Sequence, residues 1–153
     1  MKLVKQSKGN WIYELALNEA ELLLGIVKKF PVNKLAPVKI SRTDKESKAK
    51  EREKMLNESL AEHRRELKKT ALNLINPSKF KRVEKGLLMM LNGEERETLL
   101  QILNDIRVGC WQALGEPEEL HPSKPEIDPK EFAYWSLMEL AGYFEHRLIC
   151  EED

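Results

Sequence analysis

The pattern L-N-x-x-E occurs at residues 17–21 and again at residues 91–95, and it marks the places where two helices begin. In this pattern the side-chain oxygen of Asn18 or Asn92 accepts a hydrogen bond from a backbone N–H near the glutamate. The side chain of that glutamate in turn reaches back to the asparagine. Asp128, followed by a proline and then by a glutamate three residues on, starts a third helix. The repeat therefore indicates one folding device, rather than a chemical site or an internal duplication.

Apolar residues at helical spacing follow each start and predict helices over about residues 18–29, 92–114 and 129–149. A fourth, longer helix is predicted over residues 44–75. Its first part, residues 44–54, is almost entirely charged and is expected to be either a solvated extension or frayed. Only its later part carries an apolar stripe that can pack on a core, formed by Leu56, Leu60, Leu67, Ala71 and Leu74.

Strands are predicted near the N-terminus and before the third helix. The segments "KLVKQ" and "WIYELAL" flank the turn residues "SKGN" and read as a hairpin. The run "LLMML" at residues 87–91 is assigned as a third strand, because a helix start follows it directly. The expected fold class is α+β, mainly α, with a four-helix core and a small antiparallel sheet made by the N-terminal hairpin and residues 87–91.

A chain of 153 residues is long enough for one domain with a core of its own. We therefore expect a single mainly helical domain over residues 1–153, in which residues 31–54 form a partly extended, charged connector. The last helix is unusual because it is apolar on two sides, so it is either central to its bundle or shared with a partner. One side carries Ala133, Leu137, Leu140, Phe144 and Leu148, and the other carries Trp135, Met138, Gly142 and Ile149.

The charges are unevenly distributed although the net charge is zero. Residues 1–86 hold 21 basic and 11 acidic side chains, a net charge of +10, whereas residues 87–153 hold 5 and 15, a net charge of −10. The simplest interpretation is that the two parts face each other within one fold or solvate separate faces. The alternatives are head-to-tail self-association and an anionic partner for the basic part.

Two surfaces are candidates for binding. Leu100, Asn104, Arg107 and Trp111 follow one another at helical spacing, which is typical either of a recognition face or of side chains that bond another helix end or the loop at residues 115–128. With the second side of the last helix, this stripe gives the candidate interface residues Asn104, Arg107, Trp111, Trp135, Met138 and Gly142.

The second candidate surface is the basic segment of residues 64–85, which would bind RNA or DNA through phosphate contacts and a stacking aromatic. Glutamates interleave with its basic residues, and no nucleic-acid-binding motif frames it, so a solvated helix face is the structural alternative. The candidate residues are Arg64, Arg65, Lys79, Phe80, Lys81 and Arg82.

Catalytic, cofactor and metal sites are not predicted. The sequence contains no Gly-rich phosphate loop, no G-x-S-x-G and no H-E-x-x-H. Cys110, His146 and Cys150 lack the close spacing of zinc ligands, so ordinary reduced thiols of a cytoplasmic protein are expected. No apolar run approaches the roughly 20 residues of a membrane span, and membrane partners are not expected.

The stretches "WIYELALNEAELLLGIV", "LNGEERETLLQILNDIRVGCWQALG" and "YWSLMELAGYFEHRL" resemble an uncharacterised bacterial family, domain of unknown function 2017. The resemblance covers about residues 11–30, 87–115 and 130–149, and its most distinctive part is Leu103-Asn104-Asp105-x-Arg107. It implies a cytoplasmic, mainly helical protein without assigned activity. The occurrence of family members near genes for a Clp protease adaptor further implies a context of protein quality control.

These observations favour a non-enzymatic protein-interaction or regulatory protein, with self-association as one form of that function. The alternative function is RNA or DNA binding through residues 64–85.

Overall fold

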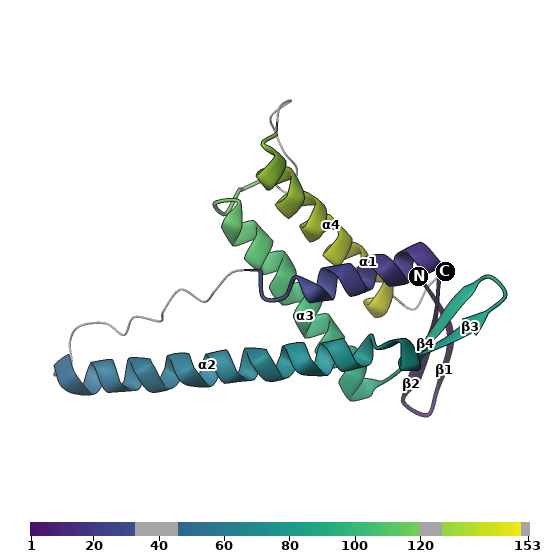
Figure 1. Ribbon diagram of the computed structural model, residues 1–153, viewed down its shortest axis with the longest axis horizontal. Coiled ribbons are helices and arrows are strands. Elements are labelled where there is room, and N and C mark those ends of the chain that lie inside the picture. The colour runs from purple at the N-terminus through teal and green to yellow at the C-terminus, as the bar shows by residue number, and fades with distance from the viewer. Residues whose placement is uncertain (33–45, 120–126, 151–153) are drawn as a thin grey trace.

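The chain begins with a β-hairpin, continues through two helices, returns to the sheet as a second hairpin and ends in two further helices. The computed structural model describes residues 1–32, 46–119 and 127–150 (Figure 1). The predicted α+β, mainly α fold is confirmed. The elements are β1 (Lys2–Ser7), β2 (Asn10–Leu15), α1 (Leu17–Lys28), α2 (Glu46–Leu74), a 3-10 turn (Pro77–Lys79), β3 (Phe80–Val83), β4 (Gly86–Asn92), α3 (Gly93–Ala113) and α4 (Pro129–Ile149).

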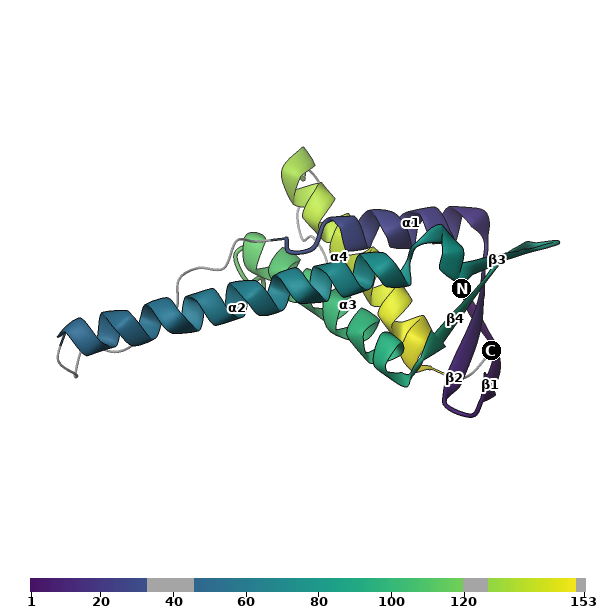
Figure 2. The same cartoon turned by 60° about the horizontal axis from the view of Figure 1, so that its bottom comes forward.

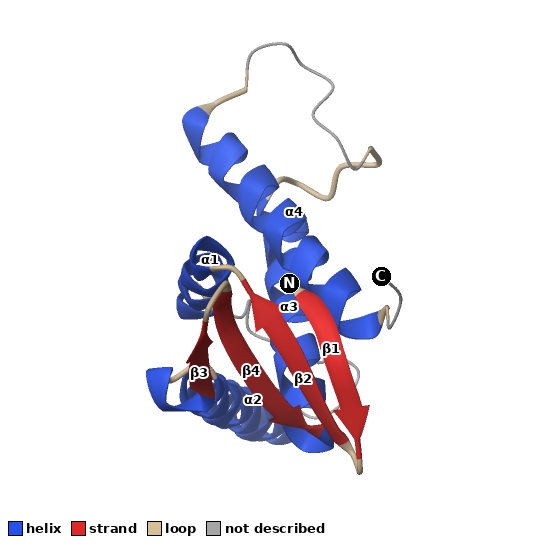
Figure 3. Cartoon of the chain, turned by 90° about the vertical axis from the view of Figure 1, so that its right-hand side faces the viewer, coloured by secondary structure: helices blue, strands red, loops and turns tan. Residues whose placement is uncertain are grey.

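The sheet is antiparallel, with the strand order β1-β2-β4-β3, and its helices lie on one side (Figure 3). In the central pair, Tyr13 lies opposite Met89, and both are buried. Their neighbours Ile12 and Met90 point to the other face, where Met90 is 56% exposed. This alternation is the period-two pattern of a sheet with one face on the core and one face open.

Strand β3 was not among the predicted elements, whereas the strand predicted at residues 87–91 is confirmed as β4. The short sequence of β3 has charged residues at Lys81 and Arg82 and lies at the edge of the sheet, so it lacks the apolar pattern of a central strand. The β3–β4 hairpin closes against the end of β2 at Gly86. A side chain at Gly86 would overlap the carbonyl oxygen of Leu15, so the close approach of the two backbones requires glycine here.

Two of the three predicted helix starts are confirmed. Asn92 accepts from the N–H of Glu95 at 2.9 Å at the start of α3, and Asp128 accepts from the N–H of Lys130 at 2.7 Å at the start of α4. The prediction that Asn18 begins α1 is wrong, because the chain leaves the sheet after Leu15 and becomes helical at Leu17.

The first turn of α1 is fastened by a different residue. The Glu19 carboxylate accepts from the backbone N–H of Ala16 at 2.9 Å, whereas the Asn18 side chain accepts from the adjacent N–H of Glu19. Glu19 therefore does the work that the sequence pattern assigned to Glu21.

Helix α2 packs on the body of the protein only through its C-terminal part, and its N-terminal part projects beyond the other elements (Figures 1 and 2). Ala71 and Leu74 are buried, whereas Met55 is 67% exposed. This division agrees with the predicted stripe, although Leu56 is exposed. Residues 46–54 of the expected connector form the first turns of α2, and its residues 33–45 lie outside the described part of the chain.

Candidate interaction groove

The two apolar sides of α4 have different surroundings. The core takes Trp135, Met138, Ala141, Phe144 and Leu148, which follow one another at three- and four-residue intervals. Trp135 and Met138 are only 9% and 7% exposed, so their assignment to a binding surface is corrected: they are core residues. In the N-terminal half of α4, the side with Ala133, Leu137 and Leu140 stays exposed or only partly buried. Phe144 and Leu148, which continue this side toward the C-terminus, lie in the core, so the core takes residues from both predicted sides.

This accessible side of α4 forms one wall of a groove, and Lys29 and Val32, which follow the end of α1, form the other. The groove has a volume of about 520 Å³ and is lined by Lys29, Val32, Lys130, Ala133, Tyr134, Ser136, Leu137 and Leu140. Phe30, which is buried, anchors the end of α1 in the core. Val32 lies against α3, where a Cβ at Gly109 would come within 3.1 Å of its own Cβ. The walls are therefore held by the core, and the groove is preformed.

Basic side chains flank this apolar groove. Lys29 and Lys130 are both exposed, and neither forms an ion pair with another described residue. The acidic residues of this half of α4, Glu131 and Glu139, do not line the groove. The combination is an apolar floor with a positively charged rim.

The predicted stripe on α3 is used mainly inside the molecule. Arg107 Nη1 donates to Glu145 Oε2 of α4 at 2.5 Å, and its guanidinium side chain crosses Gly142, where a Cβ would lie 3.4 Å from Arg107 Nε. Trp111 Nε1 donates to the carbonyl oxygen of Pro117 at 3.1 Å. These contacts match the structural alternative, in which the stripe bonds another helix and the following loop.

Asn104 is the one member of the stripe that stays exposed, and it faces a second hollow. This hollow of about 380 Å³ lies between α2 and α3. Its lining mixes apolar and polar side chains: Leu60, His63, Arg64, Leu67, Gln101, Asn104 and Asp105.

The residues proposed for nucleic-acid binding do not form one surface. Arg65 pairs with Glu62 at 2.7 Å, and Lys79 pairs with Glu95 at 2.8 Å. Lys81 and Arg82 are consecutive in β3 and so point to opposite faces of the sheet. Phe80 is partly buried and packs against the core, so it is not available to stack on a base.

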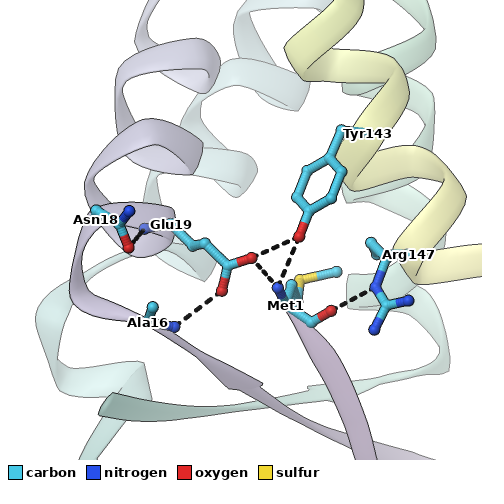
Figure 4. Close-up of polar contacts among 6 residues, drawn as sticks. All are labelled: Met1, Ala16, Asn18, Glu19, Tyr143 and Arg147. Carbon is cyan, nitrogen blue, oxygen red and sulfur yellow. Dashed lines mark hydrogen bonds and ion pairs between the residues drawn. The ribbon is translucent and has the colours of Figure 1, made fainter. Parts of the chain in front are cut away.

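A cluster that has no signal in the sequence joins the N-terminus to α1 and α4 (Figure 4). The Met1 ammonium group donates to Glu19 Oε1, and the Tyr143 hydroxyl donates to the same oxygen at 2.5 Å. Arg147 Nε donates to the carbonyl oxygen of Met1. Burial alone would raise the pKa of Glu19, but the hydrogen bonds from Met1, Tyr143 and Ala16 outweigh it and hold this pKa below its ordinary value.

Arg96 makes a second connection of this kind, between the sheet and the end of α4. Its guanidinium group donates to the carbonyl oxygen of Leu148 at 2.7 Å and lies 5.0 Å from the centre of the Trp11 ring. Trp11 and Leu148 are 137 positions apart in the sequence. Contacts at such separation leave no local pattern, so they could not be found from one sequence.

Only two of the three thiol and imidazole groups weighed as zinc ligands, those of His146 and Cys150, come together. Cys110 lies in the core, and burial raises the pKa of its thiol to about 11. Cys150 Sγ lies 3.4 Å from His146 Nδ1 at the end of α4. Within residues 1–32, 46–119 and 127–150, no three His, Cys, Asp or Glu residues are grouped to hold a metal ion.

The helices in the described part of the chain also lack the combined length and apolar character that crossing a membrane requires.

No family model, curated protein or solved structure matches the chain. The resemblance to domain of unknown function 2017 therefore stays a prediction, and the groove must be interpreted from its own chemistry.

Proposed function

We propose that this chain is a non-enzymatic protein-interaction or regulatory protein, and that it binds its partner through the groove between α1 and α4. The observation that carries the proposal is the apolar lining that α4 gives the groove, where Ala133 is exposed and Leu137 and Leu140 are only partly buried. Accessible apolar surface that is rimmed by polar residues often marks a site of interaction with another protein.

The non-enzymatic character is supported by the surroundings of the titratable groups. Perturbed pKa values often mark catalytic residues. Here, however, the carboxylates of Glu19 and Glu95, whose pKa values are lowered, both fasten the first turn of a helix. Cys110 and Tyr143, whose pKa values are raised, owe the shift first to burial. These shifts therefore have structural causes.

Affinity capture followed by mass spectrometry tests the proposal with a matched pair of variants. Ala133→Glu places a charge in the groove, and Ala61→Glu makes the same change at an exposed position of α2. We expect a partner that is recovered with the wild-type protein and with Ala61→Glu, but is lost with Ala133→Glu. Recovery of the same proteins by all three chains would mean that the groove is not the binding surface.

Two finer parts of the proposal have their own supports. Self-association would use the same accessible side of α4, and light scattering at high concentration tests it, since a strict monomer would remove this version. The cytoplasmic location and the quality-control context rest on the family resemblance. Partners enriched in protease or chaperone components would support that context.

A further inference from the structure

We infer that the groove receives an amphipathic α-helix of a partner protein, with acidic residues beside the apolar stripe of that helix. This inference rests on the proposed function and specifies its partner. Three features carry it: the ridge of α4 that forms one wall of the groove, the small number of uncharged polar groups in its lining, and the sign of the charge on its rim.

The walls favour a helix because of their shape. Ala133, Leu137 and Leu140 are spaced by four and three residues, so they form a ridge along α4 that faces the end of α1. A partner helix can pack its own side-chain ridge along the ridge of α4, which places its residues i, i+3 or i+4 and i+7 in the groove. From Ala133 to Leu140 the ridge rises by about 10 Å, or two helical turns.

The lining is poorly suited to an extended occupant. A peptide in extended form must pair its backbone N–H and C=O groups, which is why such peptides bind at the edges of sheets. The α4 wall of this groove offers the side chains of a helix instead of a strand edge, and its only uncharged polar groups are those of Tyr134 and Ser136. A helix satisfies its own backbone groups and needs none from the groove.

The charge of the rim specifies acidic flanks. Lys29 and Lys130 come from different helices, are both exposed, and have no ionic partner among the described residues. Carboxylates beside the apolar stripe of the incoming helix would pair with these lysines, and a basic helix would be repelled. Exposed pairs of this kind are individually weak, so they determine selectivity more than affinity.

Fluorescence anisotropy with model peptides tests the inference on the full chain. The first labelled probe has about 14 residues, which is four helical turns, with leucines at i, i+3 and i+7 and glutamates at the flanking positions. The second has lysines in place of the glutamates, and the third has the composition of the first in scrambled order. We expect the acidic striped peptide to bind about tenfold more tightly than the basic one, with the preference weakening at high salt.

Variants at exposed positions connect the binding to the groove, with circular dichroism as the check that each is folded. Lys29→Glu combined with Lys130→Glu is expected to reverse the preference between the acidic and basic peptides. Ala133→Glu is expected to abolish binding of the acidic peptide, whereas Ala61→Glu leaves it unchanged. The inference would be overturned if the variant with both lysines replaced kept the wild-type preference for the acidic peptide. It would also be overturned if the scrambled peptide bound as tightly as the acidic striped one.

The remaining outcomes distinguish this inference from the proposed function. If no acidic peptide binds while capture of a cellular partner still depends on Ala133, the partner class is wrong and the interaction function stands. If light scattering shows a dimer that Ala133→Glu dissociates, the occupant is a second copy of this chain, and the inference of a separate acidic helix fails.

Discussion

Glu19 shows how one side chain can join parts of a chain that lie far apart in the sequence. Its carboxylate accepts from the Met1 ammonium group, from the Tyr143 hydroxyl and from the backbone of Ala16. It therefore fastens the start of α1 and connects β1 to α4. No sequence pattern identifies this role, because Tyr143 lies 124 positions away from Glu19. The pattern L-N-x-x-E instead pointed to Asn18 and Glu21, which lie two positions too late.

The first prediction concerns the substitution Glu19→Gln. The folded pKa of Glu19 lies below its ordinary value of 4.5, so its stabilising contribution is complete above that pH and is lost as the pH falls through the folded pKa. We expect Glu19→Gln to lower the free energy of unfolding by about 1–2 kcal/mol at neutral pH. The difference from wild type should shrink in acid. Urea titrations across this pH range measure it.

The control for this prediction is Glu21→Gln, which changes an exposed carboxylate of the same helix. A change within about 0.5 kcal/mol is expected at that position. If Glu19→Gln and Glu21→Gln behaved alike at every pH, the Met1 cluster would have no part in stability.

At the scale of the elements, the apolar patterns predict the helices well and the edges of the sheet poorly. In α3 the apolar residues Leu99, Leu103, Ile106 and Cys110, which are spaced for one helical face, are completely buried. Leu114, which continues this predicted stripe just after the helix, is partly buried. Strand β3 was not predicted because it lies at an edge of the sheet and two of its four residues are charged. The two apolar sides predicted for α4 do not correspond to core and surface, because the core takes Trp135 and Met138 from one side and Phe144 and Leu148 from the other. The buried face changes along the helix because it depends on how α4 packs on its neighbours, which is tertiary information.

The second prediction concerns α2. Its last turns pack on the core through Ala71 and Leu74, whereas the turns around Met55 project into solvent. These exposed turns can unfold locally without disrupting the core. We therefore expect their backbone amides to exchange hydrogen at least about 100-fold faster than those near Ala71. Hydrogen exchange with mass spectrometry measures both parts in one experiment, with the amides of α3 as the protected reference. Uniform protection along α2 would contradict the division.

The third prediction compares two glycines. Gly25 lies within α1, is exposed, and a Cβ added there would meet nothing within 4 Å. Gly25→Ala is therefore expected to raise the free energy of unfolding by about 0.5–1 kcal/mol, because alanine loses less backbone entropy in a helix. Gly86→Ala should instead lower it by more than about 2 kcal/mol, because the new methyl group overlaps the Leu15 carbonyl. Thermal unfolding of the two variants measures whether each substitution raises or lowers stability. A loss of stability in Gly25→Ala would disprove the expectation for that position.

At the scale of the whole molecule, the basic and acidic parts of the sequence pack on each other. Helix α2, from the basic part, contacts α3 of the acidic part, and Lys79 pairs with Glu95 across the same division. The simplest interpretation of the charge layout, that the two parts face each other in one fold, agrees with these contacts. The single domain expected from chain length stays a prediction. The groove could not be predicted, because its lining comes from α4 and from Lys29 and Val32, which are separated from α4 by about a hundred residues in the sequence.

The fourth prediction follows from this distribution of charge. Because Arg65 and Lys79 are paired and Lys81 and Arg82 point apart, the chain should not hold RNA or DNA through residues 64–85. A gel shift at low salt compares the wild-type chain with one in which Lys79, Lys81 and Arg82 are replaced by glutamine. We expect no change in any residual binding. A tenfold loss of affinity in the substituted chain would revive the nucleic-acid function.

The projecting helix also has a hydrodynamic consequence. With 29 residues, α2 is about 43 Å long, and much of that length adds frictional drag while adding little mass. The monomer should therefore sediment more slowly than a sphere of the same mass and elute early from a sizing column, at the position of a heavier particle. An elution volume alone would then suggest a dimer. The mass measured by light scattering would distinguish an elongated monomer from a true dimer.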